Sequence, residues 1–147
     1  MKKLSIVILS FNVKTKLLAC LKSLPQHVDW EIIVVDNAST DGSAAIADIK
    51  NPVNIGFAAG NNVGIKKSTG QFVLLLNPDT IVYPNTIETI LKYMEEHPDV
   101  GAATCRVELP DGSLDYSCHR GFPTPWGALL HFLGLRSFSN YTSHNIS

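Results

Sequence analysis

Two carboxylates stand close behind apolar runs that are typical of buried strands. Asp36 directly follows residues 31–35, and Asp79 follows residues 71–76 after a short Asn-Pro step. A carboxylate at a strand end can coordinate a divalent cation carried by a diphosphate, or accept hydrogen bonds from a nucleobase or ribose. The same residues can instead cap the backbone N–H groups of the turn that follows. From spacing alone, both interpretations stay open.

The segment at residues 54–64 is punctuated by Gly56, Gly60 and Gly64. It lacks the Gly-Lys-Ser/Thr of a Walker loop and the Gly-x-Gly-x-x-Gly of a dinucleotide site. Its glycines fit either close approach of the backbone to a ligand or tight packing of a helix against a sheet. Both interpretations stay open here as well.

Composition and residue spacing exclude several classes of function. The formal net charge of −1 excludes a general basic surface, so we expect no nucleic-acid partner. The five histidines are scattered without zinc-type spacing, and no Gly-x-Ser-x-Gly elbow supports serine hydrolysis. Cys20, Cys105 and Cys118 fit the ordinary thiols of a reduced cytosolic protein, although the last two could face each other across a hairpin.

Strand and helix patterns alternate along the chain, which predicts an α/β fold with a mainly parallel sheet and helices on both faces. In such sheets ligands bind beyond the carboxyl ends of the strands. Three predicted strands end in polar clusters there: Ser10-Phe11-Asn12, Asp36-Asn37 and Asn77-Pro78-Asp79. We expect strands over residues 4–11, 31–35, 71–76, 100–108 and 114–118, and helices over residues 15–24, 44–49 and 84–97. The glycine-punctuated segment at 54–64 is also expected to become helical, through residue 67.

The two ends of the chain carry separate expectations. The apolar start reads as a buried strand rather than a signal peptide, because Asn12, Lys14 and Lys16 interrupt it. No stretch reaches the roughly 18 apolar residues of a membrane span. From Gly121 onward the periodicity fades while apolar residues continue, so we expect the chain to stop before its domain does.

Four stretches, in this order, resemble the family 2 glycosyltransferases that have the GT-A fold. They are SIVILSFN at residues 5–12, VVDNASTDGS at 34–43, NIGFAAGN at 54–61 and LLNPDT at 75–80. Residues 100–141 look more narrowly like the rhamnosyltransferase-type members from bacteria. The resemblance implies an incomplete GT-A domain. Residues 1–120 would form its nucleotide-sugar-binding portion, and residues 121–147 the start of a truncated acceptor-side region.

The resemblance implies transfer of a sugar, with inversion, from a UDP- or dTDP-linked donor such as dTDP-rhamnose. The acceptor would be a hydroxyl of a saccharide or lipid-linked saccharide in cell-surface polysaccharide synthesis. A divalent metal, Mg²⁺ or Mn²⁺, would be held by Asp79 and stabilise the leaving diphosphate without proton transfer. The implied nucleotide-sugar site comprises Ser10, Phe11, Asn12, Asp36, Asn37, Asn54, Gly56, Asn61, Asn77 and Asp79.

Within that site the resemblance implies distinct roles. Ser10, Phe11 and Asn12 would line the base pocket, and Asp36 would bind the base. Asn54, Gly56 and Asn61 would lie along the nucleoside and phosphates, and Asn77 would face the ribose. Cytoplasmic localisation, including a peripheral place at the inner membrane face, fits this role, and a homodimer is allowed.

Two departures from the family pattern limit these implications. Asn77 replaces the first carboxylate of the family's Asp-x-Asp, so one anionic ligand remains. The family's catalytic base lies in a later Glu-Asp segment that this sequence lacks, so the catalytic residue is unassigned and we expect the chain alone to be inactive. The alternative is a non-catalytic nucleotide-binding or interaction module. A nucleotidyltransferase ranks last, because residues 10–13 form no glycine-rich basic loop.

Overall fold

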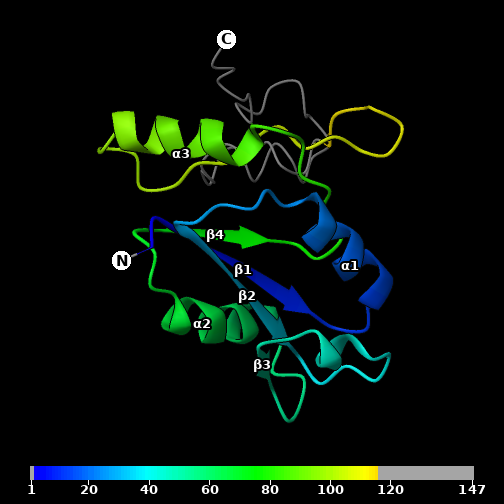
Figure 1. Ribbon diagram of the computed structural model, residues 1–147. Helices are drawn as coiled ribbons and strands as arrows, with labels where there is room; N and C mark the ends of the chain where they lie inside the picture. Colours follow the sequence, from blue (N-terminus) through cyan, green and yellow to red (C-terminus); the bar gives the residue numbers. More distant parts are fainter. Residues whose placement is uncertain (1, 116–147) are drawn as a thin grey trace, which may run out of the picture. The chain divides into compact units, whose positions relative to one another are not determined.

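The computed structural model describes residues 2–115, and its centre is a sheet of four parallel strands in the order β3-β2-β1-β4 (Figure 1). The strands are β1 (Leu4–Ser10), β2 (Trp30–Asp36), β3 (Ile49–Lys50) and β4 (Phe72–Leu76). β1 pairs with β2 on one side and with β4 on the other. Because all the strands are parallel, their carboxyl ends share one edge.

Helices cover both faces of this sheet. α1 (Lys14–Ser23) lies on one face, and α2 (Phe57–Lys67) packs against β1 and β2 on the other (Figure 1). α3 (Thr86–Glu96) contributes Ile87 and Leu91 to the core on the α1 side. The chain divides into two compact units, Met1–Tyr93 and Met94–Ser147, and the sheet belongs to the first. The predicted parallel α/β architecture with helices on both faces is confirmed.

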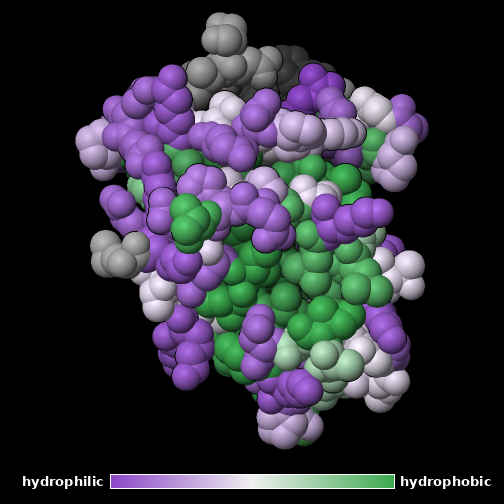
Figure 2. Space-filling view, in the orientation of Figure 1, coloured by the Kyte–Doolittle hydropathy of each residue, from purple (hydrophilic) through white to green (hydrophobic). Residues whose placement is uncertain are grey.

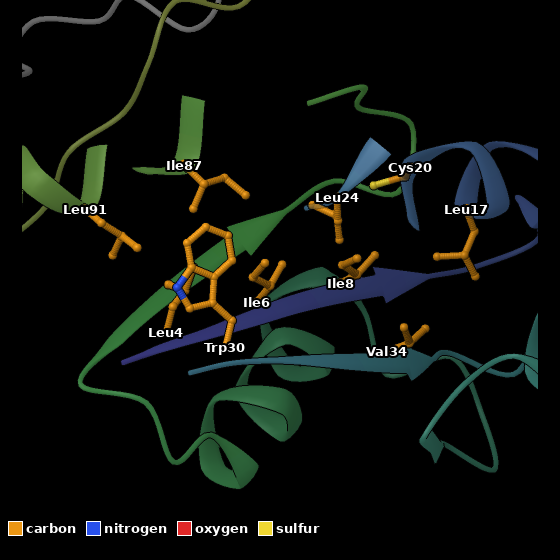
Figure 3. Packing of buried hydrophobic residues seen from close by; sticks show 10 residues of the cluster. All are labelled: Leu4, Ile6, Ile8, Leu17, Cys20, Leu24, Trp30, Val34, Ile87 and Leu91. Atoms are coloured by element: carbon orange, nitrogen blue, oxygen red, sulfur yellow. The ribbon is translucent and has the colours of Figure 1, made fainter. Parts of the chain in front are cut away.

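The core forms where alternate side chains of the central strands meet α1 and α3. Side chains alternate between the two faces of a strand, so every second residue of β1 points to this side. Burying one large aliphatic side chain contributes about 1.5–3 kcal/mol, which makes this cluster the main source of stability. The cluster, shown in Figure 3, consists of Leu4, Ile6, Ile8, Leu17, Cys20, Leu24, Trp30, Val34, Ile87 and Leu91.

On the opposite face, glycines allow α2 to approach β1 closely. A Cβ atom at Gly64 would lie 2.4 Å from Cγ1 of Val7, and one at Gly60 would lie 2.6 Å from Cδ1 of Leu9. These two glycines therefore serve helix packing, the second of the two interpretations. Gly56 differs, since it precedes α2 with φ of +85° and has open space around it.

Two predicted elements are wrong. Residues 44–49 do not form a helix; a 3₁₀ turn at Ser43–Ala45 is followed by β3, which pairs with the end of β2. The Asp48 carboxylate accepts the Val34 N–H at 2.8 Å and holds this stretch against β2. Residues 100–108 are not a strand either, and only an isolated antiparallel bridge joins Glu108 to Leu114 around the turn at Asp111.

Burial also differs from the periodic pattern in two places. β4 is an edge strand within the described residues, with Val73 and Leu75 exposed by 42% and 49%, although its apolar run is typical of a strand buried in the middle of a sheet. Figure 2 shows hydrophobic side chains gathered where Figure 1 draws the sheet. On α1, helical spacing predicts one apolar stripe of Leu17, Leu18, Leu21 and Leu24, but Leu18 is exposed and Cys20 is buried.

Some expectations fall outside the described residues. They include the return strand beyond Asp115, Cys118 and the division of the chain at residue 120. Within the described part, no helix has the length and hydropathy needed to cross a membrane.

Candidate functional site

The polar ends of β1, β2 and β4 lie side by side at the carboxyl edge of the sheet. Ser10 at the end of β1 is in register with Asp36 at the end of β2. Ile8 of β1 is in register with Leu76, so Asn77 leaves β4 at the same edge. The topology therefore brings together three segments that are far apart in the sequence.

Asp36 and Ser10 form a buried polar pair with unused hydrogen-bonding capacity. Asp36 is 1% exposed and Ser10 is fully buried. Oδ2 of Asp36 accepts the backbone N–H of Ser39 at 2.9 Å, which fits a turn cap. Its Oδ1 and the Ser10 hydroxyl have no hydrogen-bond partner among the described residues. Buried polar atoms are normally satisfied, so these two can accept a ligand group or an ordered water.

Asn37 holds the glycine-containing segment against the end of β2. Its side-chain nitrogen donates to Oδ1 of Asn54 at 2.7 Å and to the carbonyl of Gly56 at 3.3 Å. Its side-chain oxygen accepts from the Asn51 amide and the Ile55 N–H, both at 3.1 Å. The Asn37 amide is thus fully used within the protein, which makes it a positioning group for the 51–56 loop.

Asn12 joins the loop after β1 to the loop after β2. Its backbone N–H donates to Oγ of Ser39 at 2.9 Å, and its Oδ1 accepts the Thr40 N–H at 2.8 Å. Asn12 has φ of 54°, a left-handed conformation that asparagine tolerates better than most residues. Beside it lies an open depression of about 350 Å³, lined by Asn12, Val13, Lys14, Thr15, Lys16 and Asp41.

The other predicted nucleotide-site residues differ in exposure. Phe11 is 45% exposed, and Asn54 and Gly56 are also exposed, so these three are accessible to a ligand. Asn61 is only 5% exposed, and its side-chain nitrogen donates to the Phe57 carbonyl of its own helix at 3.0 Å. Asn61 therefore contributes to α2 itself in this structure.

Asp79 lies after β4 and pairs with a helix of distant sequence. Its Oδ2 is 3.8 Å from Nζ of Lys16, and both side chains are more than half exposed. The Cys20 thiol donates to the Asn77 carbonyl at 3.7 Å. Burial first, and the Asp79 charge second, raise the pKa of Cys20 to about 11. This thiol is therefore protonated and inert, in agreement with its prediction as an ordinary buried cysteine.

The donor set at Asp79 decides what kind of metal site fits there. The described residues contain no group of three or more His, Cys, Asp or Glu side chains that could hold a metal ion. Mg²⁺ at phosphate sites is held by one or two carboxylates, and phosphates and water complete its shell. Asp79 therefore fits a cation whose shell is completed by a diphosphate, and without a diphosphate its carboxylate alone would bind such a cation only weakly.

Several residues that shape this edge were not predicted as site residues. Ser39, Thr40 and Asp41 belong to a polar cluster that the sequence marks as a turn with capping residues. The sequence does not show that this cluster forms hydrogen bonds with the loop after β1. Lys16 carries no sequence signal, because a lysine on a polar helix face resembles any solvated residue. Only the fold places it beside Asp79.

Sequence comparison identifies relatives of this chain. The sequence model described as "Glycosyl transferase family 2" matches residues 5–147. A glycosyltransferase of Haemophilus influenzae is 33% identical over 106 residues, which cover 66% of this chain and 36% of that protein. This chain thus spans about a third of the length of that relative.

Structural comparison points to the same fold. Residues 1–349 of TarS from Staphylococcus aureus, which is named a poly(ribitol-phosphate) β-N-acetylglucosaminyltransferase, match with a TM-score of 0.59 and 24% identity. The match covers 65% of this chain and 33% of that one. The same protein in complex with UDP-GlcNAc matches with a TM-score of 0.58 and 21% identity, over 75% and 41% of the two chains. The predicted GT-A type of fold is confirmed, and the chain belongs to glycosyl transferase family 2.

Proposed function

We propose that the carboxyl edge of this sheet binds a nucleoside diphosphate sugar, and that the whole protein transfers the sugar to an acceptor hydroxyl with inversion. The observation that carries the proposal is the buried Asp36 carboxylate, whose Oδ1 is an unused acceptor beside the Ser10 hydroxyl. The family membership and the likeness to a protein solved with UDP-GlcNAc support it. Residues 1–120 form the nucleotide-sugar-binding portion in this proposal, and residues 121–147 begin the acceptor-side region.

The pair at the ends of β1 and β2 suits the imide edge of uracil or thymine. Such an edge offers one N–H between two carbonyl oxygens, and the Asp36 carboxylate and the Ser10 hydroxyl provide an acceptor and a donor. Because both are buried, the contact requires movement of the residues that cover them or a bridging water. The exposed Phe11 ring offers an apolar surface next to this pair.

The diphosphate end of the proposed site lies at Asp79. Asp79 would hold the Mg²⁺ or Mn²⁺ that accompanies the diphosphate, and Asn77 would face the ribose. A metal there stabilises the negative charge that develops on the departing nucleoside diphosphate. Rhamnose as the sugar, dTDP as its carrier, a saccharide acceptor in cell-surface polysaccharide synthesis and a cytoplasmic place are finer parts of the proposal, supported by resemblance alone.

Calorimetry with nucleoside diphosphates tests the donor site directly. We expect UDP and dTDP to bind in the presence of Mn²⁺, and ADP, which lacks an imide edge, to bind more weakly. Asp36→Asn removes the charge while keeping the shape, and should weaken UDP binding about tenfold. Asp99→Asn, at an exposed position of the second unit, should have no effect. Equal affinity for UDP and ADP, or no binding of either, would contradict the donor-site proposal.

The second candidate function is a non-catalytic nucleotide-binding module. The polar strand ends that would bind the donor all lie within residues 10–79, whereas no residue of this chain is assigned as the catalytic base. The two candidates differ in the fate of the sugar. We expect the whole protein to release UDP or dTDP from a nucleotide sugar when a saccharide acceptor is added. Binding without release across a panel of donors and acceptors would favour the binding module.

A further inference from the structure

Lys16 lies beside the carboxylate that the proposed function assigns to the diphosphate end of the site. Its Nζ is 3.8 Å from Oδ2 of Asp79, and the two side chains are exposed by 64% and 54%. The pair joins the first turn of α1 to the segment after β4, at the edge where the polar strand ends meet. An exposed ion pair contributes little to the stability of the fold, so this pair matters for its position at the proposed donor site.

Packing of α1 sets this location through two further contacts with the same segment. The Cys20 thiol donates to the Asn77 carbonyl at 3.7 Å, and the Val82 N–H donates to Oγ of Ser23 at 3.0 Å. Residues four positions apart lie on the same side of a helix, so Lys16 stands one turn from Cys20 over that segment. The helix therefore holds Lys16 near Asp79 independently of the rotamer of either side chain.

The charge of Asp79 acts at short range in this region. After burial, the Asp79 carboxylate is the next cause of the raised pKa of the Cys20 thiol, which lies under α1. The 3.8 Å between Nζ of Lys16 and Oδ2 of Asp79 is also well inside the Debye length of about 8 Å at physiological ionic strength, so salt does not fully screen this pair. A cation that competes for Asp79 should therefore lower the affinity of Asp79 for a metal ion by a measurable factor.

We propose that Lys16 is a counter-cation built into the donor site. It pairs with Asp79 when no metal is bound, and with the donor diphosphate when a divalent metal takes Asp79. The inference rests on the proposed function, because it requires a diphosphate and a metal at this edge. Asn77 adds no negative charge here, so a single protein carboxylate offsets the metal. A lysine ammonium on its flexible stem can move between two anions that lie close together.

The two roles of Lys16 predict opposite effects when its charge is removed. In Lys16→Met the competitor for Asp79 is lost, so Mn²⁺ alone should bind about threefold more tightly. The same substitution removes a cation near the diphosphate, so UDP without metal should bind about threefold more weakly. Lys16→Glu should enlarge both shifts, because it adds a second carboxylate beside Asp79.

The experiment uses the full chain and two separate titrations. Mn²⁺ binding is followed by electron paramagnetic resonance without nucleotide, and UDP binding is followed by calorimetry with EDTA present. Lys22→Met and Lys22→Glu, on the last turn of the same helix, provide matched charge changes. Because Lys16 and Lys22 are both exposed, all four variants should keep the near-UV circular dichroism of the wild type.

Opposite shifts at Lys16, with neither shift at Lys22, support the inference. It is overturned if the Lys16 and Lys22 variants behave alike, or if Mn²⁺ and UDP affinities move in the same direction. In that case wild-type binding of UDP with Mn²⁺ leaves the proposed function standing. If the wild type does not bind UDP even with Mn²⁺ present, the proposed function fails and the inference fails with it. If UDP binds with Mn²⁺ but no Mn²⁺ binding is detected without nucleotide, the inference alone is overturned.

Discussion

Oδ2 of Asp41 accepts a hydrogen bond from the backbone N–H of Lys14 at 2.8 Å, so the loop after β2 caps the helix after β1. The residue before α1 is Val13, which has no side-chain cap hydrogen bond of its own. Oδ1 of Asp41 accepts the N–H of Ser43 at 2.9 Å and also its hydroxyl. One carboxylate thus ties together two loops of the proposed base pocket before any ligand arrives.

Replacing Asp41 should therefore loosen the start of α1. In Asp41→Ala the Lys14 N–H loses its acceptor, and we expect faster amide hydrogen exchange at residues 14–16 together with a lower thermal midpoint. Asp99→Ala removes an exposed carboxylate from the second unit and serves as the control. Unchanged exchange at residues 14–16 in the Asp41 variant would show that the cap contributes nothing to the helix start.

At the opposite edge of the sheet, the Glu31 carboxylate accepts hydrogen bonds whose strength should depend on pH. Oε1 of Glu31 accepts hydrogen bonds from the Ser5 hydroxyl, the Thr69 N–H and the Thr69 hydroxyl. Burial raises the pKa of Glu31, but these hydrogen bonds and the charge of Lys2 together outweigh it, so the net pKa is lowered. A lowered pKa in the folded state means that the stabilisation is complete above the unfolded-state pKa and lost as the pH falls through the folded-state pKa.

Glu31→Gln should remove this pH dependence as well as some stability. We expect a loss of about 1 kcal/mol at pH 7, since a neutral amide oxygen accepts the same bonds more weakly. Urea denaturation between pH 7 and about pH 3, a range that spans the ordinary pKa of a glutamate, should show the wild type losing stability more steeply than the variant. Parallel pH profiles for the two proteins would contradict the assignment.

Gly64 should not tolerate even one extra methyl group. A Cβ atom there would meet Cγ1 of Val7 at 2.4 Å and Cγ2 of Val35 at 3.2 Å, both on buried strands. Overpacking of this kind costs about 1–3 kcal/mol, partly offset by the better helix propensity of alanine. Gly64→Ala should lower the urea midpoint, whereas Asn62→Ala at an exposed position of α2 should not. A stabilised Gly64 variant would mean that α2 can move away from the sheet.

Replacing Asn37 should both destabilise the fold and loosen the loop at residues 51–56. Asn37→Asp keeps the size but replaces the donor that faces Oδ1 of Asn54 and the Gly56 carbonyl with an acceptor. We expect a loss of about 2–3 kcal/mol in denaturation, because buried polar atoms become unpaired. Exchange at the Ile55 and Gly56 amides should accelerate, and UDP binding should weaken. Full stability of the Asn37→Asp variant, with Ile55 still protected, would contradict this role; Asn62→Asp is the surface control.

The Cys20 thiol should resist alkylation in the native protein. Its pKa is raised to about 11 and its side chain is fully buried, so at pH 8 little thiolate forms and little reagent reaches it. Iodoacetamide followed by peptide mass spectrometry should modify the partly exposed Cys105 first and Cys20 only after unfolding. Rapid native modification of Cys20 would indicate that α1 separates from the sheet.

Much of the fold could be predicted from short-range patterns. The apolar β-branched runs predicted β1, β2 and β4 to within a residue or two, because a buried parallel strand needs apolar side chains on both faces. α1 and α3 followed from the spacing of their apolar residues and from the prolines near their ends. For α2 the sequence indicated a helix through Lys67 but not where it begins. β3 could not be predicted in this way, because two residues have no periodicity and are placed by pairing with β2.

The candidate site was predictable in its location and not in its contacts. The polar residues that follow each strand indicated which residues reach the carboxyl edge, and the parallel order places them together. Their hydrogen bonds depend on loops that approach from elsewhere, as Asn37 with Asn54 and Asn12 with Thr40 show. The same dependence explains why Asn61 serves its own helix and why Lys16 was missed.

The sequence by itself determined the strand and helix alternation, the family resemblance and the carboxylates at Asp36 and Asp79, since these depend on residue types and local spacing. Only the tertiary structure decided that Oδ1 of Asp36 is left without a partner among the described residues and that Lys16 stands beside Asp79. It also decided that β4 is an edge strand with half-exposed Val73 and Leu75 in the described part. Burial and charge pairing depend on which segments, far apart in the sequence, pack together, and a local sequence pattern does not specify those contacts.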